Sequence, residues 1–130
     1  MVAGTLLEAQ DLESYRWNSR LLLIHTDGLE SEAYLNQMAM MKRESEGLKE
    51  RRLVIFTFWK DQYKVGLEDS GWKTAEPGFT GWTNPESGFE VILIGLDGGV
   101  KLRQEQAIKP EELFARIDAM PMRRQEIRNK

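Results

Sequence analysis

Residues 20–59 read RLLLIHTDGLESEAYLNQMAMMKRESEGLKERRLVIFTFW, and they contain two apolar runs that flank one amphipathic segment. The first run, Arg20–Thr26, is apolar through its centre, which is typical of a strand buried on both faces. The second run, Arg52–Trp59, is rich in β-branched and aromatic residues, which strands favour. Between the runs we expect a helix over residues 29–48. This unit predicts two parallel strands joined by a right-handed crossover.

A helix start is predicted directly after the first strand. Asp27 and Glu30 stand three residues apart, the spacing of a capping box in which each side chain accepts a hydrogen bond from the other residue's backbone N–H. We therefore interpret Asp27 as a helix cap and not as a catalytic acid. The stripe of this helix that faces the core is expected to contain side chains at helical spacing: Tyr34, Leu35, Met38, Met41, Ser45 and Leu48.

A β-hairpin is predicted in the second half of the chain. Phe89–Gly95 and Val100–Arg103 flank an Asp97-Gly98 pair, and such a pair between two strands is a strong hairpin signal because tight turns need positive φ. Pro110 stands where the first turn of a following helix tolerates proline. Pro121 is expected to end or kink that helix.

Two segments carry weaker structural signals. Residues 60–88 are rich in glycine, and we expect an irregular segment with a short helical turn near residues 61–67. Aromatic side chains are expected to pin this segment to the rest of the domain: Trp72, Phe79 and Trp82. Residues 122–130 are expected to form a basic tail that is partly loose.

The predicted elements fit a single domain over residues 1–130. Their order is helix, strand, helix, strand, irregular segment, hairpin and helix. A parallel pair extended by an antiparallel hairpin gives a central mixed sheet of about four strands, flanked by helices on both sides. The expected fold class is therefore α/β with a thioredoxin-like layout.

The composition excludes several kinds of chemistry. The chain has no cysteine and one histidine, His25, so it cannot form disulfides, use a thiol nucleophile or build a cysteine or multi-histidine metal site. It is therefore neither a thiol oxidoreductase nor a peroxiredoxin, and we expect no cofactor. The net charge of −3 makes nucleic acid an unexpected partner. No apolar run is long enough to span a membrane, and residues 1–10 show no signal-peptide pattern, which leaves the compartment open.

Three segments point to a family: residues 15–23 (YRWNSRLLL), 93–103 (LIGLDGGVKLR) and 117–126 (IDAMPMRRQE). They resemble a bacterial family of uncharacterised domains that is related to the DUDES module of the extracellular sushi-repeat proteins and Equarin. The resemblance implies a thioredoxin-like fold and no established activity. It also implies export, if the chain is a mature segment. One position departs from the family, where a basic residue is expected in place of Leu96.

The candidate site residues are basic and lie mainly towards the two ends of the chain. Residues 116–130 contain five basic and two acidic residues, and arginine side chains match carboxylate or phosphate groups with paired N–H donors. We expect the basic residues near Trp17 to converge with those near Pro121 at the start of the first strand. The alternative is structural: Pro121 redirects the chain, Arg123 pairs with internal acids, and the tail is solvated. The candidate ligand or partner surface consists of Arg16, Arg20, Lys101, Arg123 and Arg124.

Three functions are open at this point. The preferred interpretation is a redox-inactive binding domain that recognises a protein or a small acidic ligand. The second is an enzyme of unrecognised mechanism that uses Asp97, Asp27 or His25 in a deep pocket. Thr26 is a weak nucleophile candidate, because the neighbouring His25 points to the opposite face of the strand. The third is a structural, matrix-type module that presents aromatic residues such as Trp72 on a flat patch. No catalytic or metal-binding residue is assigned.

Overall fold

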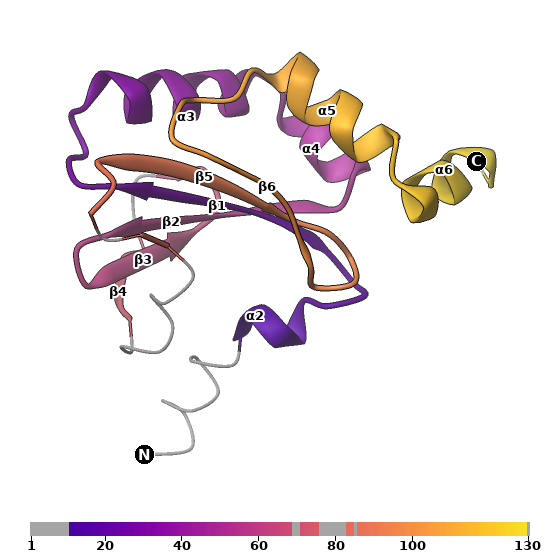
Figure 1. Ribbon diagram of the computed structural model, residues 1–130, viewed down its shortest axis with the longest axis horizontal. Coiled ribbons are helices and arrows are strands. Elements are labelled where there is room, and N and C mark those ends of the chain that lie inside the picture. Colours follow the sequence, from indigo (N-terminus) through magenta and orange to yellow (C-terminus); the bar gives the residue numbers. More distant parts are fainter. Residues whose placement is uncertain (1–10, 69–70, 76–82, 85, 130) are drawn as a thin grey trace.

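The computed structural model describes residues 11–68, 71–75, 83–84 and 86–129. At the centre of this part lies a mixed sheet of six strands in the order β4-β3-β2-β1-β5-β6 (Figure 1). β1 and β2 are parallel, and the remaining neighbours are antiparallel. The strands are β1 (Arg20–Thr26), β2 (Leu53–Trp59), β3 (Gln62–Val65), β4 (Lys73–Thr74), β5 (Phe89–Ile94) and β6 (Val100–Gln104).

Helices cover both faces of the sheet. Three of them, α3 (Glu32–Arg43), α4 (Ser45–Glu50) and α5 (Pro110–Asp118), lie over one face, and the short α2 (Asp11–Ser14) lies on the other (Figure 1). The last helix, α6 (Pro121–Arg128), extends beyond one end of the sheet. This arrangement confirms the predicted α/β class, with six strands in place of about four.

The alternation of side chains along β1 divides the core into two clusters. Leu22 and Ile24 pack in the cluster that includes side chains of α3, α4 and α5. Leu21 and Leu23 pack on the opposite face, against Leu12 of α2 and aromatic side chains of β2 and β3. Each fully buried side chain of this kind contributes roughly 1.5–3 kcal/mol. β1 is therefore the strand buried on both faces that its sequence predicts.

The crossover helix begins later than predicted and is divided in two. Ser31, not Asp27, is the cap of α3, and its hydroxyl accepts a hydrogen bond of 3.3 Å from the backbone N–H of Tyr34. α3 ends at Arg43, and α4 starts at Ser45, so the expected helix over residues 29–48 is wrong at both its start and its continuity. The capping box predicted the correct region but the wrong residue, because Ser31 lies closer to the first helical turn.

The expected apolar stripe is largely confirmed across these two helices. Tyr34, Met38, Met41 and Leu48 are buried in the core cluster, whereas Leu35 is 52% exposed. Leu35 directly follows Tyr34, and neighbouring residues on a helix point in different directions. The buried members fix α3 and α4 to the sheet.

The expected helical turn near residues 61–67 is wrong, because residues 62–65 form β3. Lys60 adopts a φ of 56° in a two-residue turn between the paired residues Trp59 and Gln62. A lysine with positive φ is unusual, so sequence signals based on glycine and asparagine miss this hairpin.

Most of the expected basic tail is helical, because residues 121–128 form α6, and Lys130 at its end lies outside the described residues. Pro121 occupies the first position of this helix. Proline ends one helix, yet its fixed φ also suits the first turn of the next.

The aromatic residues of the 60–88 segment fall partly within the described chain. Trp72 packs edge-on against Trp59, with 5.7 Å between the ring centroids. Phe79 and Trp82 lie outside the described residues. The contact of Trp72 agrees with its expected role in holding the segment to the body of the domain.

Candidate functional site

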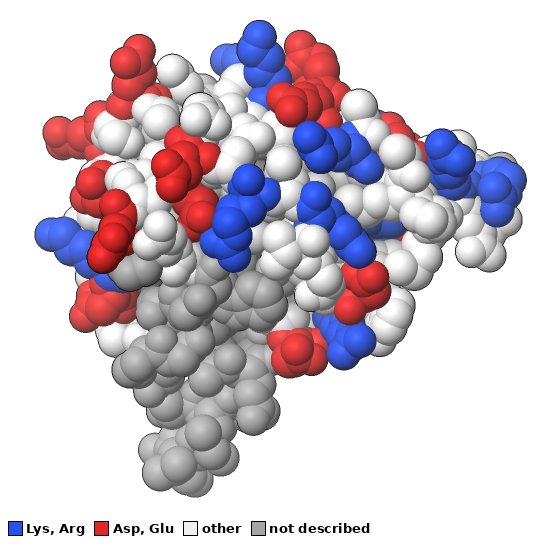
Figure 2. Space-filling model, viewed as in Figure 1, with Lys and Arg blue, Asp and Glu red and all other residues white. Residues whose placement is uncertain are grey.

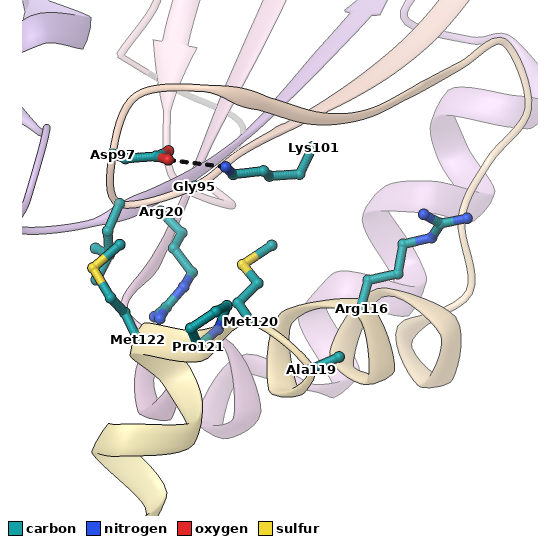
Figure 3. Close-up of a pocket in the computed structure, with 10 residues that line it drawn as sticks. Arg20, Gly95, Asp97, Lys101, Arg116, Ala119, Met120, Pro121 and Met122 are labelled. Atoms are coloured by element: carbon teal, nitrogen blue, oxygen red, sulfur yellow. Dashed lines mark hydrogen bonds and ion pairs between the residues drawn. The ribbon is translucent and has the colours of Figure 1, made fainter.

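A pocket of about 550 Å³ opens between the β5–β6 turn and the junction of α5 with α6 (Figure 3). Its apolar lining comes from Leu96, Ala119, Met120, Pro121 and Met122. Its polar lining comes from Arg20, Asp97, Lys101 and Arg116. Segments from the start of β1, the hairpin and the C-terminal helices therefore meet at one place, although they lie far apart in the sequence.

The hairpin turn forms one wall of the pocket. The Asp97 carboxylate accepts a hydrogen bond of 2.9 Å from the backbone N–H of Gly99 and one of 3.0 Å from Lys101 Nζ. These two hydrogen bonds hold the pKa of Asp97 below its usual value. A Cβ at Gly95 would lie 2.6 Å from Lys101 Cε, so a larger residue there would make the Lys101 side chain shift from its present path across the turn.

The junction of α5 with α6 forms the facing wall. Proline disfavours the helical conformation in the residue before it, and Met120 is accordingly extended, with φ −72° and ψ 141°. The chain therefore breaks between the helices at this residue. Figure 3 shows the Met120 and Met122 side chains pointing from this junction towards the hairpin turn.

A cluster of arginines and carboxylates, here called the arginine cluster, joins α6 to the body of the domain beside this pocket. Arg123 Nε donates to Asp118 at 2.9 Å, Nη1 to Glu126 at 3.3 Å and Nη2 to Glu50 at 3.0 Å. Arg20 donates to the same Glu126 at 3.2 and 3.3 Å. Glu126 therefore links a strand in the centre of the sheet to the last helix.

Arginines hold both central carboxylates of the cluster in the charged form. Burial would raise the pKa of Asp118, but hydrogen bonds from Arg51 and Arg123 outweigh it and lower that pKa. Burial would likewise raise the pKa of Glu126, and the hydrogen bonds from Arg20 and Arg123 lower it below its usual value. The cluster is thus a charge-balanced set of ion pairs and not an excess of positive charge.

The structure separates the predicted site residues into two groups. Arg20 and Lys101 line the pocket. Arg16 lies at the same hairpin turn, because its side chain comes within 3.4 Å of the Cβ position at Gly98. Arg16 also lies over the ring of Trp17, which is 56% exposed and so lies outside the core.

The remaining predicted site residues do not face the pocket. Arg123 is 2% exposed and is engaged by internal acids, as the structural alternative expected. Arg124 is exposed on α6 and does not line the pocket. Sequence reasoning missed the roles of Asp118 and Glu126. The spacing of Arg123 and Glu126 would have indicated an ion pair, had a helix been expected there.

In redox-active thioredoxin-like proteins, the reactive thiol lies between the first strand and the start of the next helix. In this chain, the hydroxyl groups of Thr26 and Ser31 make the hydrogen bonds of that segment. Thr26 Oγ1 donates to the Gly28 carbonyl at 2.8 Å and accepts from the Gly28 N–H at 3.2 Å. The Ser31 hydroxyl caps the following helix. Thr26 is fully buried and has no basic side chain within hydrogen-bond distance among the described residues, so it has no base to activate it.

His25 lies on the opposite face of β1 from Thr26. In the register of β1 with β5, His25 stands opposite Glu90. Glu90 is 3% exposed, and its carboxylate accepts hydrogen bonds from Arg103 at 2.8 Å and from the Asn84 N–H at 3.0 Å. Burial lowers the pKa of His25, and the negative charges of Glu90 and Asp27 oppose part of this shift. Asp97 lies in the hairpin turn, apart from His25 and Asp27, so the three acid–base candidates do not form one constellation.

Neither a metal site nor a membrane-spanning helix is found in the described ranges. Residues 11–68, 71–75, 83–84 and 86–129 contain no group of three metal-ligating side chains. Over the same ranges, no helix is long and apolar enough to cross a membrane. Acidic and basic side chains are interspersed over the face seen in Figure 2, and no single basic field covers that face.

Comparisons with known proteins agree with this fold. The crystal structure of Trgpx in its apo form, which has a thioredoxin-like fold, matches with a TM-score of 0.51 and 21% sequence identity over 82% of both chains. At this identity the similarity shows the fold, which is thioredoxin-like, and nothing about activity. A comparison with curated protein sequences gave no match. A family model matches residues 11–126, and the chain therefore belongs to the family described as Domain of unknown function (DUF4174).

Proposed function

We propose that this chain is a redox-inactive thioredoxin-like domain that binds an acidic ligand, or an acidic group of a partner protein, in the pocket between the hairpin turn and the α5–α6 junction. The observation that carries this proposal is the combination of an apolar wall with cationic side chains in one concave site. Its volume of about 550 Å³ falls within the roughly 300–1,000 Å³ of small-molecule sites. The absence of cysteine excludes the thiol reactions of other proteins with this fold.

The charges of the pocket favour an anion. Lys101 is balanced by Asp97, and Arg20 is balanced by Glu126. Arg116 is exposed and makes no ion pair within the described ranges. Of the three cations that line the pocket, Arg116 therefore has no partner acid among the described residues, and an acidic ligand could supply one.

The location of the pocket gives further support. The three segments that resemble the DUDES-related family, residues 15–23, 93–103 and 117–126, meet there. Every residue that lines the pocket belongs to one of them, apart from Arg116. The relation to the DUDES module is part of this proposal, and it favours a site that relatives would share over one specific to this chain.

The other two functions receive less support. For an enzyme, His25 lies near Asp27 and Glu90 but apart from Asp97, and none of these residues forms a nucleophile–base pair in the described part of the chain. For the matrix-type module, Trp72 is partly covered by Trp59 and does not stand on a flat exposed patch. Neither alternative has an observation that favours it.

A ligand screen by NMR tests the proposal. The ¹⁵N-labelled chain is titrated with a panel of small acidic, basic and neutral compounds, and acidic compounds should shift the backbone amides of Leu96, Ala119 and Met122. The double variant Lys101→Gln/Arg116→Gln should lose this response.

The matched control is Lys109→Gln/Arg128→Gln, which removes one lysine and one arginine that are exposed and do not line the pocket. This control should bind as the wild type does. The proposal is wrong if no compound shifts the pocket amides, or if both double variants weaken binding equally.

A further inference from the structure

Met122 differs from the other methionines of the described chain in its exposure. It is 37% exposed, whereas Met38 and Met41 are buried in the core. Met40 and Met120 are half-buried and pack against the core cluster. Because the chain has no cysteine, thioethers are its only sulfur groups. Oxidation of sulfur follows exposure, so Met122 is the sulfur that a small oxidant in solution meets first.

Met122 lines two pockets of different character. One is the pocket described above, whose wall is apolar where Leu96, Met120 and Met122 line it. The other is a second pocket of about 440 Å³, in which Met122 is the only apolar member of the described lining residues. Figure 3 shows the Met122 side chain extending from the start of α6 towards the hairpin turn. A change in the polarity of this one side chain therefore alters a wall of both pockets.

The second pocket offers hydrogen-bond donors to an oxygen on this side chain. Arg52, Gln125 and Asn129 line it and are exposed, and their side chains make no hydrogen bond in the described part of the chain. The two acids of this pocket are already bound to Arg123. A thioether is a weak acceptor that does not use these donors, whereas a sulfoxide is polar and accepts hydrogen bonds from them.

We propose that Met122 is a reversible oxidation site that controls the binding pocket. A hydroperoxide converts its thioether to the sulfoxide, and the sulfoxide oxygen turns to the donors of the second pocket. The apolar wall of the first pocket then loses the Met122 thioether, and its affinity for a ligand with an apolar part falls. This inference rests on the proposed function and adds a regulation of the same site.

The oxidation balances with one hydroperoxide for each methionine. The sulfur attacks one peroxide oxygen, the S–O bond forms as the O–O bond breaks, and the sulfur gives up two electrons. The leaving hydroxide, or alkoxide, takes the proton of the transferred oxygen and departs as water or an alcohol. Reduction takes two electrons and two protons from the thiols of a methionine sulfoxide reductase, and the oxygen leaves as water. This chain has no cysteine, so those thiols come from another protein.

Site-resolved oxidation tests the first part of the proposal. The folded chain is treated with hydrogen peroxide, and the sulfoxide at each methionine is followed over time by peptide mapping with tandem mass spectrometry. Met122 should be oxidised at least about tenfold faster than Met38 and Met41, which react only when the core opens. It should also be oxidised faster than the half-buried Met40 and Met120.

A binding measurement tests the second part. The probe is anilinonaphthalene sulfonate, an anion with apolar rings, and its Kd is measured before and after oxidation. The probe should shift the backbone amides of Leu96 and Ala119 in ¹⁵N spectra, which locates it in the pocket. Oxidation should weaken its binding about tenfold, because a polar sulfoxide replaces an apolar contact. Methionine sulfoxide reductases with dithiothreitol should restore the original Kd.

Two substitutions at Met122 separate its oxidation from other effects of peroxide. Met122→Leu removes the sulfur, and its Kd, whatever its value, should not change on treatment with peroxide. Met122→Gln places a polar acceptor where the sulfoxide would lie, and without peroxide it should bind the probe about tenfold more weakly than Met122→Leu. The matched control is Met40→Leu, at a half-buried methionine outside this pocket, which should keep the wild-type Kd and its response to peroxide.

Thermal unfolding checks the folding state of the variants. Met122 belongs to neither core cluster, so both Met122 variants should unfold close to the wild-type temperature. A change in Kd without a change in unfolding temperature cannot arise from partial unfolding.

Oxidation of Met122 no faster than that of Met40 would overturn the inference, as would an unchanged Kd after Met122 is oxidised. A response to peroxide that persists in Met122→Leu would overturn it as well, and so would failure of the unoxidised wild type to bind the probe in this pocket. The proposed function stands after any of these results if an acidic compound of the panel shifts the pocket amides. It fails only if no acidic compound does so.

Discussion

Removing the central cation of the arginine cluster is the sharpest test of how α6 is held. The Arg123 side chain is 2% exposed and binds three carboxylates, those of Asp118, Glu126 and Glu50. Breaking a buried ion pair by deleting one partner costs about 3–5 kcal/mol. In Arg123→Met, Asp118 would keep Arg51 and Glu126 would keep Arg20. We therefore expect a loss of about 3 kcal/mol, at the lower end of that range.

Urea unfolding followed by circular dichroism measures this loss, which corresponds to a fall in Tm of about 10 °C for a domain of this length. Arg124→Met changes the neighbouring exposed arginine and should stay within about 0.5 kcal/mol of the wild type. Amide hydrogen exchange should also accelerate in α6 of Arg123→Met before the rest of the domain responds.

The same variant has a distinctive dependence on pH. The pKa values of Asp118 and Glu126 are lowered in the folded chain. Their contribution to stability is thus fully present above their ordinary values of 3.8 and 4.5 and is lost as the pH falls through the lowered folded values. The difference between wild type and Arg123→Met should therefore shrink in acid. A loss below about 1 kcal/mol at neutral pH, or a difference that grows in acid, would refute the cluster as the anchor of α6.

Three further predictions concern other parts of the domain. Because burial lowers the pKa of His25 from 6.5, the unfolded chain binds its proton more readily, and the free energy of unfolding should fall as the pH drops below about 6.5; His25→Gln should flatten that part of a urea-unfolding profile, and an unchanged slope would contradict the assignment. Ile117→Ala opens a cavity in the core and should cost about 3 kcal/mol in chemical unfolding, whereas Ile127→Ala, at a residue 43% exposed, should cost less than about 1 kcal/mol; equal losses would show that α5 is not packed as described. Asp97→Ala removes the turn acceptor and the partner of Lys101 and should cost about 1 kcal/mol, while Asp97→Asn keeps an acceptor and should recover most of it; if Asn is no better than Ala, the hydrogen bond to the turn is not what stabilises it.

The strongest parts of the fold were predictable because they rest on strong local signals. The apolar run of β1 ends at the observed residues, Arg20 and Thr26. The Asp97-Gly98 pair marks the hairpin turn, where Gly98 has a φ of 84°. Burial on both faces requires a run of apolar residues, and a positive φ favours glycine. Sequence patterns therefore identify both features.

Other features depend on interactions between distant residues, and no local pattern reports them. The β2–β3 turn relies on a lysine with positive φ, Lys60, which the sheet stabilises against its local preference. The end of α3 and the start of α4 at Glu44 show no proline or glycine at the break. Boundaries of this kind are decided by packing and not by the propensity of single residues.

The candidate site was predicted in part for the same reason. The sequence indicated Arg20 and Lys101, which line the pocket, because arginine and lysine stand out by charge. It could not show that Arg123 is neutralised, since its partners Glu50 and Asp118 come from other helices. Nor could it show that Met122 lines two pockets, because a basic tail was expected where its helix lies.

The cap at Ser31 has a consequence for any attempt to install redox activity in this scaffold. A reactive cysteine needs free N–H groups at a helix start to stabilise its thiolate. Here the Ser31 hydroxyl already accepts from Tyr34, and Thr26 already binds Gly28 on both its N–H and its carbonyl. A single cysteine introduced after β1 would retain a near-ordinary thiol pKa and react slowly. The serine cap would have to be removed as well, so introducing thiol catalysis would require at least two substitutions.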